Sequence, residues 1–258
     1  MPPTATAAAT IFALFAAILA CLEAGYRLRI RNTPPGSYRQ FEGLGALEGA
    51  IFGLMGLLVA FTFSGAAARF DTRRQLIVEE CNAIGTAYLR VDLLPPASQP
   101  PLRQAFRAYS EARYAYYQAL PEAAAARQAE ARFTGLQQEI WIGAVAASRD
   151  GAPPAAAILL LPALNQMIDL ASTRSAARQI HPSAVIFWML GAAVIAASLL
   201  AGWGMAAGAR RSWLHLGGFA LLMTLAIYVI LDLEYPRLGL IRVDAFDHYL
   251  LDVRASMK

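Results

Sequence analysis

Four long apolar runs dominate this 258-residue sequence and limit what it can fold into. They cover residues 6–26, 44–70, 184–207 and 213–231. A helix needs about 20 consecutive apolar residues to cross the hydrocarbon core of a bilayer, and each run is about that long or longer. Charged residues make up only 16% of the chain, against about a quarter in a soluble domain. The sequence therefore predicts an all-α integral membrane protein with four transmembrane helices.

The runs form two pairs around a charged, amphipathic centre. We expect a first transmembrane helix pair at 1–70, a helical extramembrane domain at 71–182, a second transmembrane hairpin at 183–231 and a juxtamembrane tail at 232–258. No strand alternation occurs in the centre, whose helical spacing is interrupted only by turns rich in proline.

The second run has no signal that would end its helix at the membrane surface. Neither Pro nor Gly occurs between residues 66 and 84, and apolar residues recur at helical spacing beyond the run. These apolar positions are Ile77, Cys81, Ile84, Tyr88 and Val91. We expect this helix to continue out of the bilayer until Pro95 and Pro96 end it. A helix of about 50 residues is about 75 Å long, more than twice what the hydrocarbon core requires.

Small residues recur every three or four positions along the second run, which places them on one face of the helix. They are Gly45, Gly49, Gly53, Gly56, Ala60 and Ser64. In lipid such a face permits close contact between helix backbones. Two interpretations follow: plain helix packing, or a groove that lines a pore or faces a ligand.

Glu48 is an acid in the first turns of the same run, where a charge is costly unless it faces an interior. It is a candidate ring charge at a pore mouth. Alternatively, the dipole at the helix N-terminus favours an acid there. Thr62 lies two heptads further along and shares the face of Glu48.

A polar face follows on the predicted continuation of this helix. Glu79, Asn82, Thr86 and Arg90 are spaced three, four and four residues apart, which puts them on one side. Glu80 lies beside them, seven residues after Arg73, and Arg69 precedes both. The face is open to three interpretations: a solvated surface opposite the apolar stripe, a contact with another subunit, or part of an ion pathway.

Asp232, Glu234 and Arg237 surround the end of the last run. Two carboxylates this close are candidates for cation binding or proton chemistry. However, residues two apart on a helix point in different directions. Salt bridges to Arg69, Arg73 or Arg74 account for these acids equally well.

Two blocks of sequence resemble a bacterial family of membrane proteins of unknown function that carry a bestrophin-like domain. The first runs from Phe61 to Gly65 and continues through Arg69 and Glu80 to Pro95, and the second spans Asp232 to Gly239. The resemblance implies similarity to bestrophins, which are pentameric anion channels with a helical cytosolic part. It also implies that Phe61 belongs to an aromatic neck.

Other functional classes lack sequence support. We find no nucleophile elbow, P-loop, HExxH or dinucleotide fingerprint, so we expect no enzyme, cofactor or metal site. The cations are interspersed with acids, which argues against a nucleic-acid partner. Cys21 and Cys81 are expected to be buried thiols, and the three histidines interface or surface residues.

The sequence thus favours an oligomeric channel or ion-transport protein whose second helix lines the pathway, with the lipid bilayer, inorganic ions and further copies of itself as partners. The alternative is a non-conducting scaffold or sensor whose helical domain binds a partner. We expect it in the bacterial inner membrane. Its cation count favours a cytoplasmic middle domain and cytoplasmic termini. The cations on that side are Arg69, Arg73, Arg74, Arg174, Arg178, Arg237, Arg242, Arg254 and Lys258.

Overall fold

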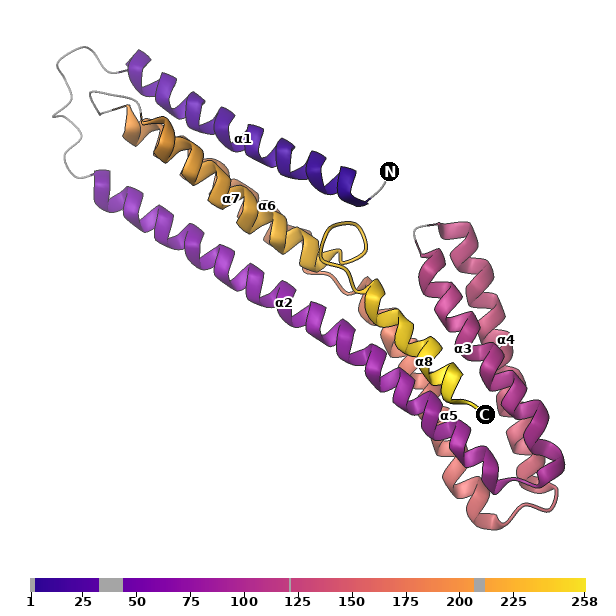
Figure 1. The fold of residues 1–258 in the computed structure, drawn as a ribbon. Coiled ribbons are helices and arrows are strands. Elements are labelled where there is room, and N and C mark those ends of the chain that lie inside the picture. The colour runs from indigo at the N-terminus through magenta and orange to yellow at the C-terminus, as the bar shows by residue number, and fades with distance from the viewer. Residues whose placement is uncertain (1–2, 33–43, 121, 207–211) are drawn as a thin grey trace. The chain divides into compact units, whose positions relative to one another are not determined.

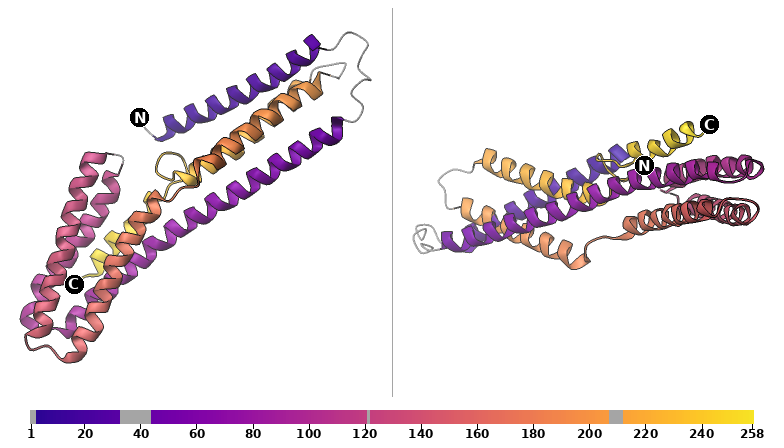
Figure 2. Two further views of the ribbon diagram at one scale, coloured as in Figure 1. Left: turned by 180° about the vertical axis from the view of Figure 1, so that it is seen from behind. Right: turned by 90° about the horizontal axis from the view of Figure 1, so that it is seen from below.

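A computed structural model of the chain describes residues 3–32, 44–120, 122–206 and 212–258 (Figures 1 and 2). Every regular element within these residues is helical. The α-helices are α1 (Pro3–Asn32), α2 (Leu44–Arg90), α3 (Gln99–Ala119), α4 (Ala123–Arg149), α5 (Pro154–Gln179), α6 (Ala184–Met205), α7 (Trp213–Glu234) and α8 (Tyr249–Ser256). Short 3-10 turns occur at η2 (Val91–Leu93), η3 (Pro96–Ser98) and η4 (Asp244–His248).

Four helical stretches in the described residues are long and apolar enough to cross a membrane: Thr4–Asn32, Gly45–Leu93, Pro154–Met205 and Trp213–Glu234. The prediction of an all-helical protein with four candidate membrane helices is therefore confirmed. The second stretch contains α2, whose 47 residues give it a length of about 70 Å. The charges that begin at Arg69 mark where α2 leaves the apolar part of its sequence.

The chain divides into two compact units. The membrane unit comprises Met1–Phe70 and His181–Arg242, and the helical unit comprises Asp71–Ile180 and Val243–Lys258. The chain passes from one unit to the other three times, so both units are built from segments that are distant in sequence.

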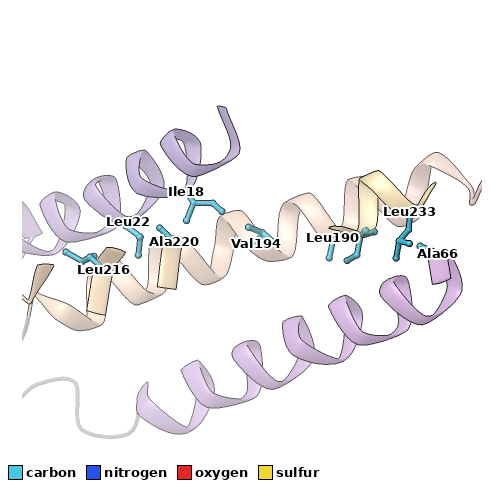
Figure 3. Close-up of a cluster of buried hydrophobic side chains, with 9 residues drawn as sticks. Ile18, Leu22, Ala66, Leu190, Val194, Leu216, Ala220 and Leu233 are labelled. Carbon is cyan, nitrogen blue, oxygen red and sulfur yellow. The ribbon is translucent and has the colours of Figure 1, made fainter. Parts of the chain in front are cut away.

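In the membrane unit, α1 packs against both α6 and α7. The contact with α6 depends on one glycine from each helix. A β-carbon added at Gly25 would lie 2.0 Å from the carbonyl oxygen of Leu199, and one added at Gly202 would lie 1.9 Å from that of Leu22. The two backbones therefore touch, as small residues allow in lipid. A cluster of buried side chains from α1, α2, α6 and α7 fills the space beside this contact (Figure 3).

In the helical unit, α3 packs against α4, α4 packs against α5, and α8 packs against α3. The predicted apolar stripe on α2 supplies part of the core, because all five of its members are at most 5% exposed. Leu250 of α8 is completely buried as well. The C-terminal segment is therefore an integral part of this unit.

Candidate functional site

The small-residue face of α2 has no close neighbour among the described residues of the chain at its four glycines. All six of its residues, Gly45, Gly49, Gly53, Gly56, Ala60 and Ser64, are exposed. Among the described residues, no atom outside the helix lies within 4 Å of a β-carbon added at any of the four glycines. Gly25 and Gly202, by contrast, are in backbone contact. The glycines of this face are therefore not used for packing against any part of the chain that the structure describes.

The three residues predicted to line an ion pathway lie on two different sides of α2. Phe61 is 68% exposed and lies next to the exposed residues Ala60 and Ser64 in the helix. Thr62 is buried, and its hydroxyl donates to the carbonyl oxygen of Leu58 at 2.6 Å. Glu48 is half-buried, with its Oε2 atom 3.6 Å from where a β-carbon at Gly204 would lie. Their role in an ion pathway stays a prediction.

A buried carboxylate joins three segments of the membrane unit. Glu234, at the end of α7, is completely buried, and its Oε2 atom accepts hydrogen bonds from Nε and Nη2 of Arg69 at 2.8 and 2.7 Å. Its Oε1 atom lies 2.8 Å from Nδ1 of His181. Gly65 leaves room for the guanidinium, because an added β-carbon would be 3.2 Å from Nη1 of Arg69. We call Arg69, His181 and Glu234 the Glu234 cluster.

Asp232 has different partners from Glu234, as their two-residue spacing predicts. Its Oδ2 atom accepts hydrogen bonds from the backbone N–H groups of Leu240 and Ile241 at 3.0 and 2.8 Å. Gly239 is required here, because an added β-carbon would lie 1.5 Å from Oδ1 of Asp232. Arg237 lies half-buried in the turn that follows α7. Asp232 thus folds the tail back onto the end of its helix.

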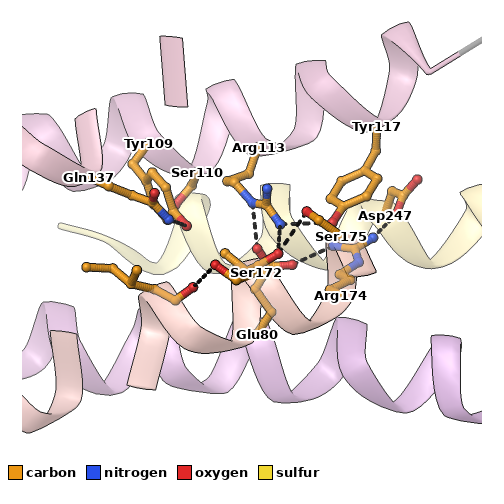
Figure 4. A network of polar contacts seen from close by, with 12 residues as sticks. Glu80, Tyr109, Ser110, Arg113, Tyr117, Gln137, Ser172, Arg174, Ser175 and Asp247 are labelled. Atoms are coloured by element: carbon orange, nitrogen blue, oxygen red, sulfur yellow. Dashed lines mark hydrogen bonds and ion pairs between the residues drawn. The ribbon is translucent and has the colours of Figure 1, made fainter. Parts of the chain in front are cut away.

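A second buried carboxylate, Glu80, organises the helical unit (Figure 4). Its Oε1 atom accepts a hydrogen bond from Nε of Arg113 at 2.6 Å, and its Oε2 atom accepts one from Nη1 of Arg174 at 2.7 Å. Arg174 also donates to Asp247 in η4, and Arg113 donates to the hydroxyl of Tyr117 at 2.8 Å. We call these five residues the Glu80 network. It connects α2, α3, α5 and η4 in a region without solvent.

Burial and charge act in opposite directions on the protonation of this network. Burial alone would raise the pKa of Glu80, but the charges and hydrogen bonds of Arg113 and Arg174 outweigh it and lower that pKa. Burial, with the nearby charge of Glu80 as a second cause, raises the pKa of Tyr117 to about 12. Glu80 is therefore ionised and Tyr117 neutral at physiological pH.

The remaining residues of the predicted polar face divide into two groups. Asn82 and Thr86 are exposed, and half-buried Glu79 accepts a hydrogen bond from Gln75 at 2.7 Å. Arg73 and Arg90 instead bind α5. Arg73 donates to the carbonyl oxygens of Ala177 and Ile180, and Arg90 donates to that of Leu159.

The burial of Glu80 could have been predicted from the sequence, although we placed Glu80 beside the polar face of the helix. Glu80 is three residues after Ile77 and four before Ile84, so it belongs on the apolar stripe rather than opposite it. Its partners Arg113, Arg174 and Asp247 lacked a comparable local pattern, as did His181. Only the tertiary fold brings these residues together.

Comparison with known proteins gives a match to a protein family. No curated protein and no solved structure matches the chain. A family model described as the bestrophin-like domain matches residues 14–245. That range covers most of the chain and contains α2, the Glu234 cluster and Glu80, Arg113 and Arg174. The chain is therefore a membrane protein of the bestrophin-like family.

Proposed function

We propose that this bestrophin-like protein is an oligomeric membrane channel or ion-transport protein in which α2 lines the pathway. The observation that carries the proposal is the exposed small-residue face of α2. Glycine is unfavourable inside a helix by about 1 kcal/mol relative to alanine. Four glycines on one face that touch no other described part of their own chain are best explained by contact with other copies or by a narrow aqueous path.

The exposed face continues along the whole of α2, with an exposed residue at every third or fourth position. After Ser64 these positions are Ala68, Asp71, Gln75, Val78, Asn82, Thr86 and Leu89. The residues are small in the apolar half and mostly polar in the charged half. This order suits a helix that lies beside an ion path in several copies. The similarity of the family to bestrophins suggests five copies.

The location that fits this function is the bacterial inner membrane, with the helical unit and both termini in the cytoplasm. The cation-rich segments around Arg69, Arg73 and Arg74 support this orientation under the positive-inside rule. Reagents that cannot cross membranes test it. A cysteine in place of exposed Ser172 should react in inverted vesicles but not in intact cells.

Cysteine crosslinking tests the contact between copies. In a background with Cys21→Ala and Cys81→Ala, the Gly53→Cys variant should form crosslinked oligomers on oxidation. Ile195→Cys, at a position 52% exposed on α6, is the matched control and should not. A monomer by light scattering, with equal crosslinking of the two variants, would contradict the proposal.

Flux from proteoliposomes tests the pathway. Ala60→Trp adds a large ring to the small-residue face and should reduce ion flux at least several-fold. Leu222→Trp, at a position 67% exposed on α7, should leave flux unchanged. Glu48→Gln and Phe61→Ala then measure the contributions of these two residues. Absence of flux from the wild type with several anions and cations would count against conduction.

The alternative function is a scaffold or sensor, and one surface of the helical unit favours it. Leu89 and Ile158 are 67% and 72% exposed, and Arg90 links their helices by its bond to Leu159. Exposed apolar side chains of this size often mark a site where another protein binds. A protein that conducts no ion, with Leu89→Ser abolishing a protein contact, would support this alternative.

A further inference from the structure

His181 lies in the connection between α5 and α6, beside a buried carboxylate. Its Nδ1 atom is 2.8 Å from Oε1 of Glu234, and its ring stacks on Tyr235 with centroids 4.8 Å apart and planes 27° apart. The side chain is 31% exposed, whereas that of Glu234 is completely buried. The ring therefore touches both water and a carboxylate that has none.

The charges of the Glu234 cluster balance only while His181 is neutral. Glu234 contributes one negative charge and Arg69 one positive charge. Neutral His181 satisfies Oε1 by donating from Nδ1–H, which leaves Nε2 as the free lone pair of the ring. Histidine is the side chain that ordinarily changes charge between about pH 5 and pH 8. Within the membrane unit, the titratable or charged groups that face it are Glu234, Tyr235 and, through Glu234, Arg69.

We propose that His181 is a proton-binding site, and that its protonation locks the connection before α6 onto the end of α7. A hydronium ion of the surrounding water gives its proton to Nε2, so that an N–H bond forms, an O–H bond breaks and a water molecule is left. The contact from Nδ1 to the ionised Glu234 is already charge-assisted, and protonation turns it into a bond between two ions of opposite charge. The face of the stacked Tyr235 ring also attracts the resulting cation.

The position of His181 connects its charge to three membrane helices. α6 begins three residues later at Ala184, and α7 ends at Glu234. Arg69 of α2 shares Glu234 with His181, Arg69 on Oε2 and His181 on Oε1, so the added charge arises on a carboxylate that also binds α2. Any effect of the proton on ion flux rests on the function proposed above, whereas the proton site itself does not.

Thermal unfolding of the full chain in detergent at about pH 8 and about pH 5.5 tests the site. His181→Asn keeps an N–H donor near Nδ1 but cannot be protonated. On acidification the wild type should gain about 2–4 °C in Tm relative to His181→Asn. His215→Asn, an exposed histidine at the start of α7, should behave as the wild type does. Equal pH responses of the wild type and His181→Asn would overturn the proposal.

A second measurement decides the matter even if His181→Asn does not fold. The chain has three histidines, so the ring signals of the wild type can be assigned by NMR from His215→Asn and His248→Asn. The remaining signal, from His181, should titrate over the same pH range. A ring signal that stays constant there would rule the proton site out. If the wild type showed no ion flux at any pH while the His181 signal still titrated, the channel proposal would be rejected and the proton site would stand.

Discussion

At the scale of single residues, Glu80 shows how a charge can be held without solvent. Its two oxygens face two guanidinium groups, and Asp247 supplies the second negative charge, so the Glu80 network is neutral. Arg113 also lies over the ring of Phe133, with its guanidinium carbon 4.5 Å from the ring centroid. Removal of one member of such a buried set leaves an uncompensated charge, which costs about 3–5 kcal/mol.

We therefore expect Glu80→Gln to lower the free energy of unfolding by about 3–5 kcal/mol. Glu79→Gln, one position earlier and half-exposed, should change it by less than about 0.5 kcal/mol. The pKa of Glu80 is lower in the folded than in the unfolded chain, so its stabilising effect is complete above the unfolded pKa. That effect disappears as the pH falls through the folded value. Denaturant titrations between about pH 7 and pH 3 should show wild type and Glu80→Gln converging in acid.

Cys81 offers a second test at this scale. Burial, and next the charge of Glu80, raise the pKa of its thiol to about 12. Because the thiolate is the reactive form, maleimide at neutral pH should not modify Cys81 in a folded Cys21→Ala variant. The same protein should react fully after denaturation. Rapid labelling of the folded variant would show that this part of α2 opens to solvent.

At the scale of elements, glycines have opposite surroundings in different helices: those between α1 and α6 are in backbone contact, and those on the small-residue face of α2 are exposed. Gly202 brings two backbones into contact, whereas Gly53 touches no other part of the chain that the structure describes. Gly202→Leu should therefore lower stability by at least about 1–3 kcal/mol, as overpacking does. In the dissociated single chain, Gly53→Ala should be neutral or stabilising by up to about 1 kcal/mol through helix propensity. Melting curves in detergent compare the two, and an intact Tm for Gly202→Leu would contradict the packing.

The elements were more predictable from the sequence than the contacts between them. The four apolar runs and the buried stripe from Ile77 to Val91 follow from spacing alone. The spacing of Glu48 and Thr62 also predicted that they share one face of α2. Spacing alone does not determine whether that face contacts the chain's own helices or an ion pathway. Partners of Glu80 lie 33 and 94 residues away, at Arg113 and Arg174, and no local pattern links them.

At the scale of the whole molecule, the helical unit is completed by the end of the chain. Leu250 is fully buried and Asp247 is a member of the Glu80 network. A chain that stops after Arg242 should therefore lose protection of the α3 amides in hydrogen exchange, while α1 and α6 keep theirs. Arg254→Ala, which removes only an exposed pair with Glu111, is the control and should leave exchange unchanged. Unchanged protection after truncation would show that the helical unit does not need this segment.

The late position of Asp247 has a consequence for biosynthesis. It follows Arg174 by 73 residues, which a ribosome adds in about 4 to 15 seconds. Glu80, Arg113 and Arg174 have all been synthesised when that interval begins. The negative charge of Asp247, which balances the network, is added only when the interval ends. During that time α6 and α7 have to enter the bilayer. The nascent helical unit must therefore wait, incompletely folded, for membrane insertion to finish.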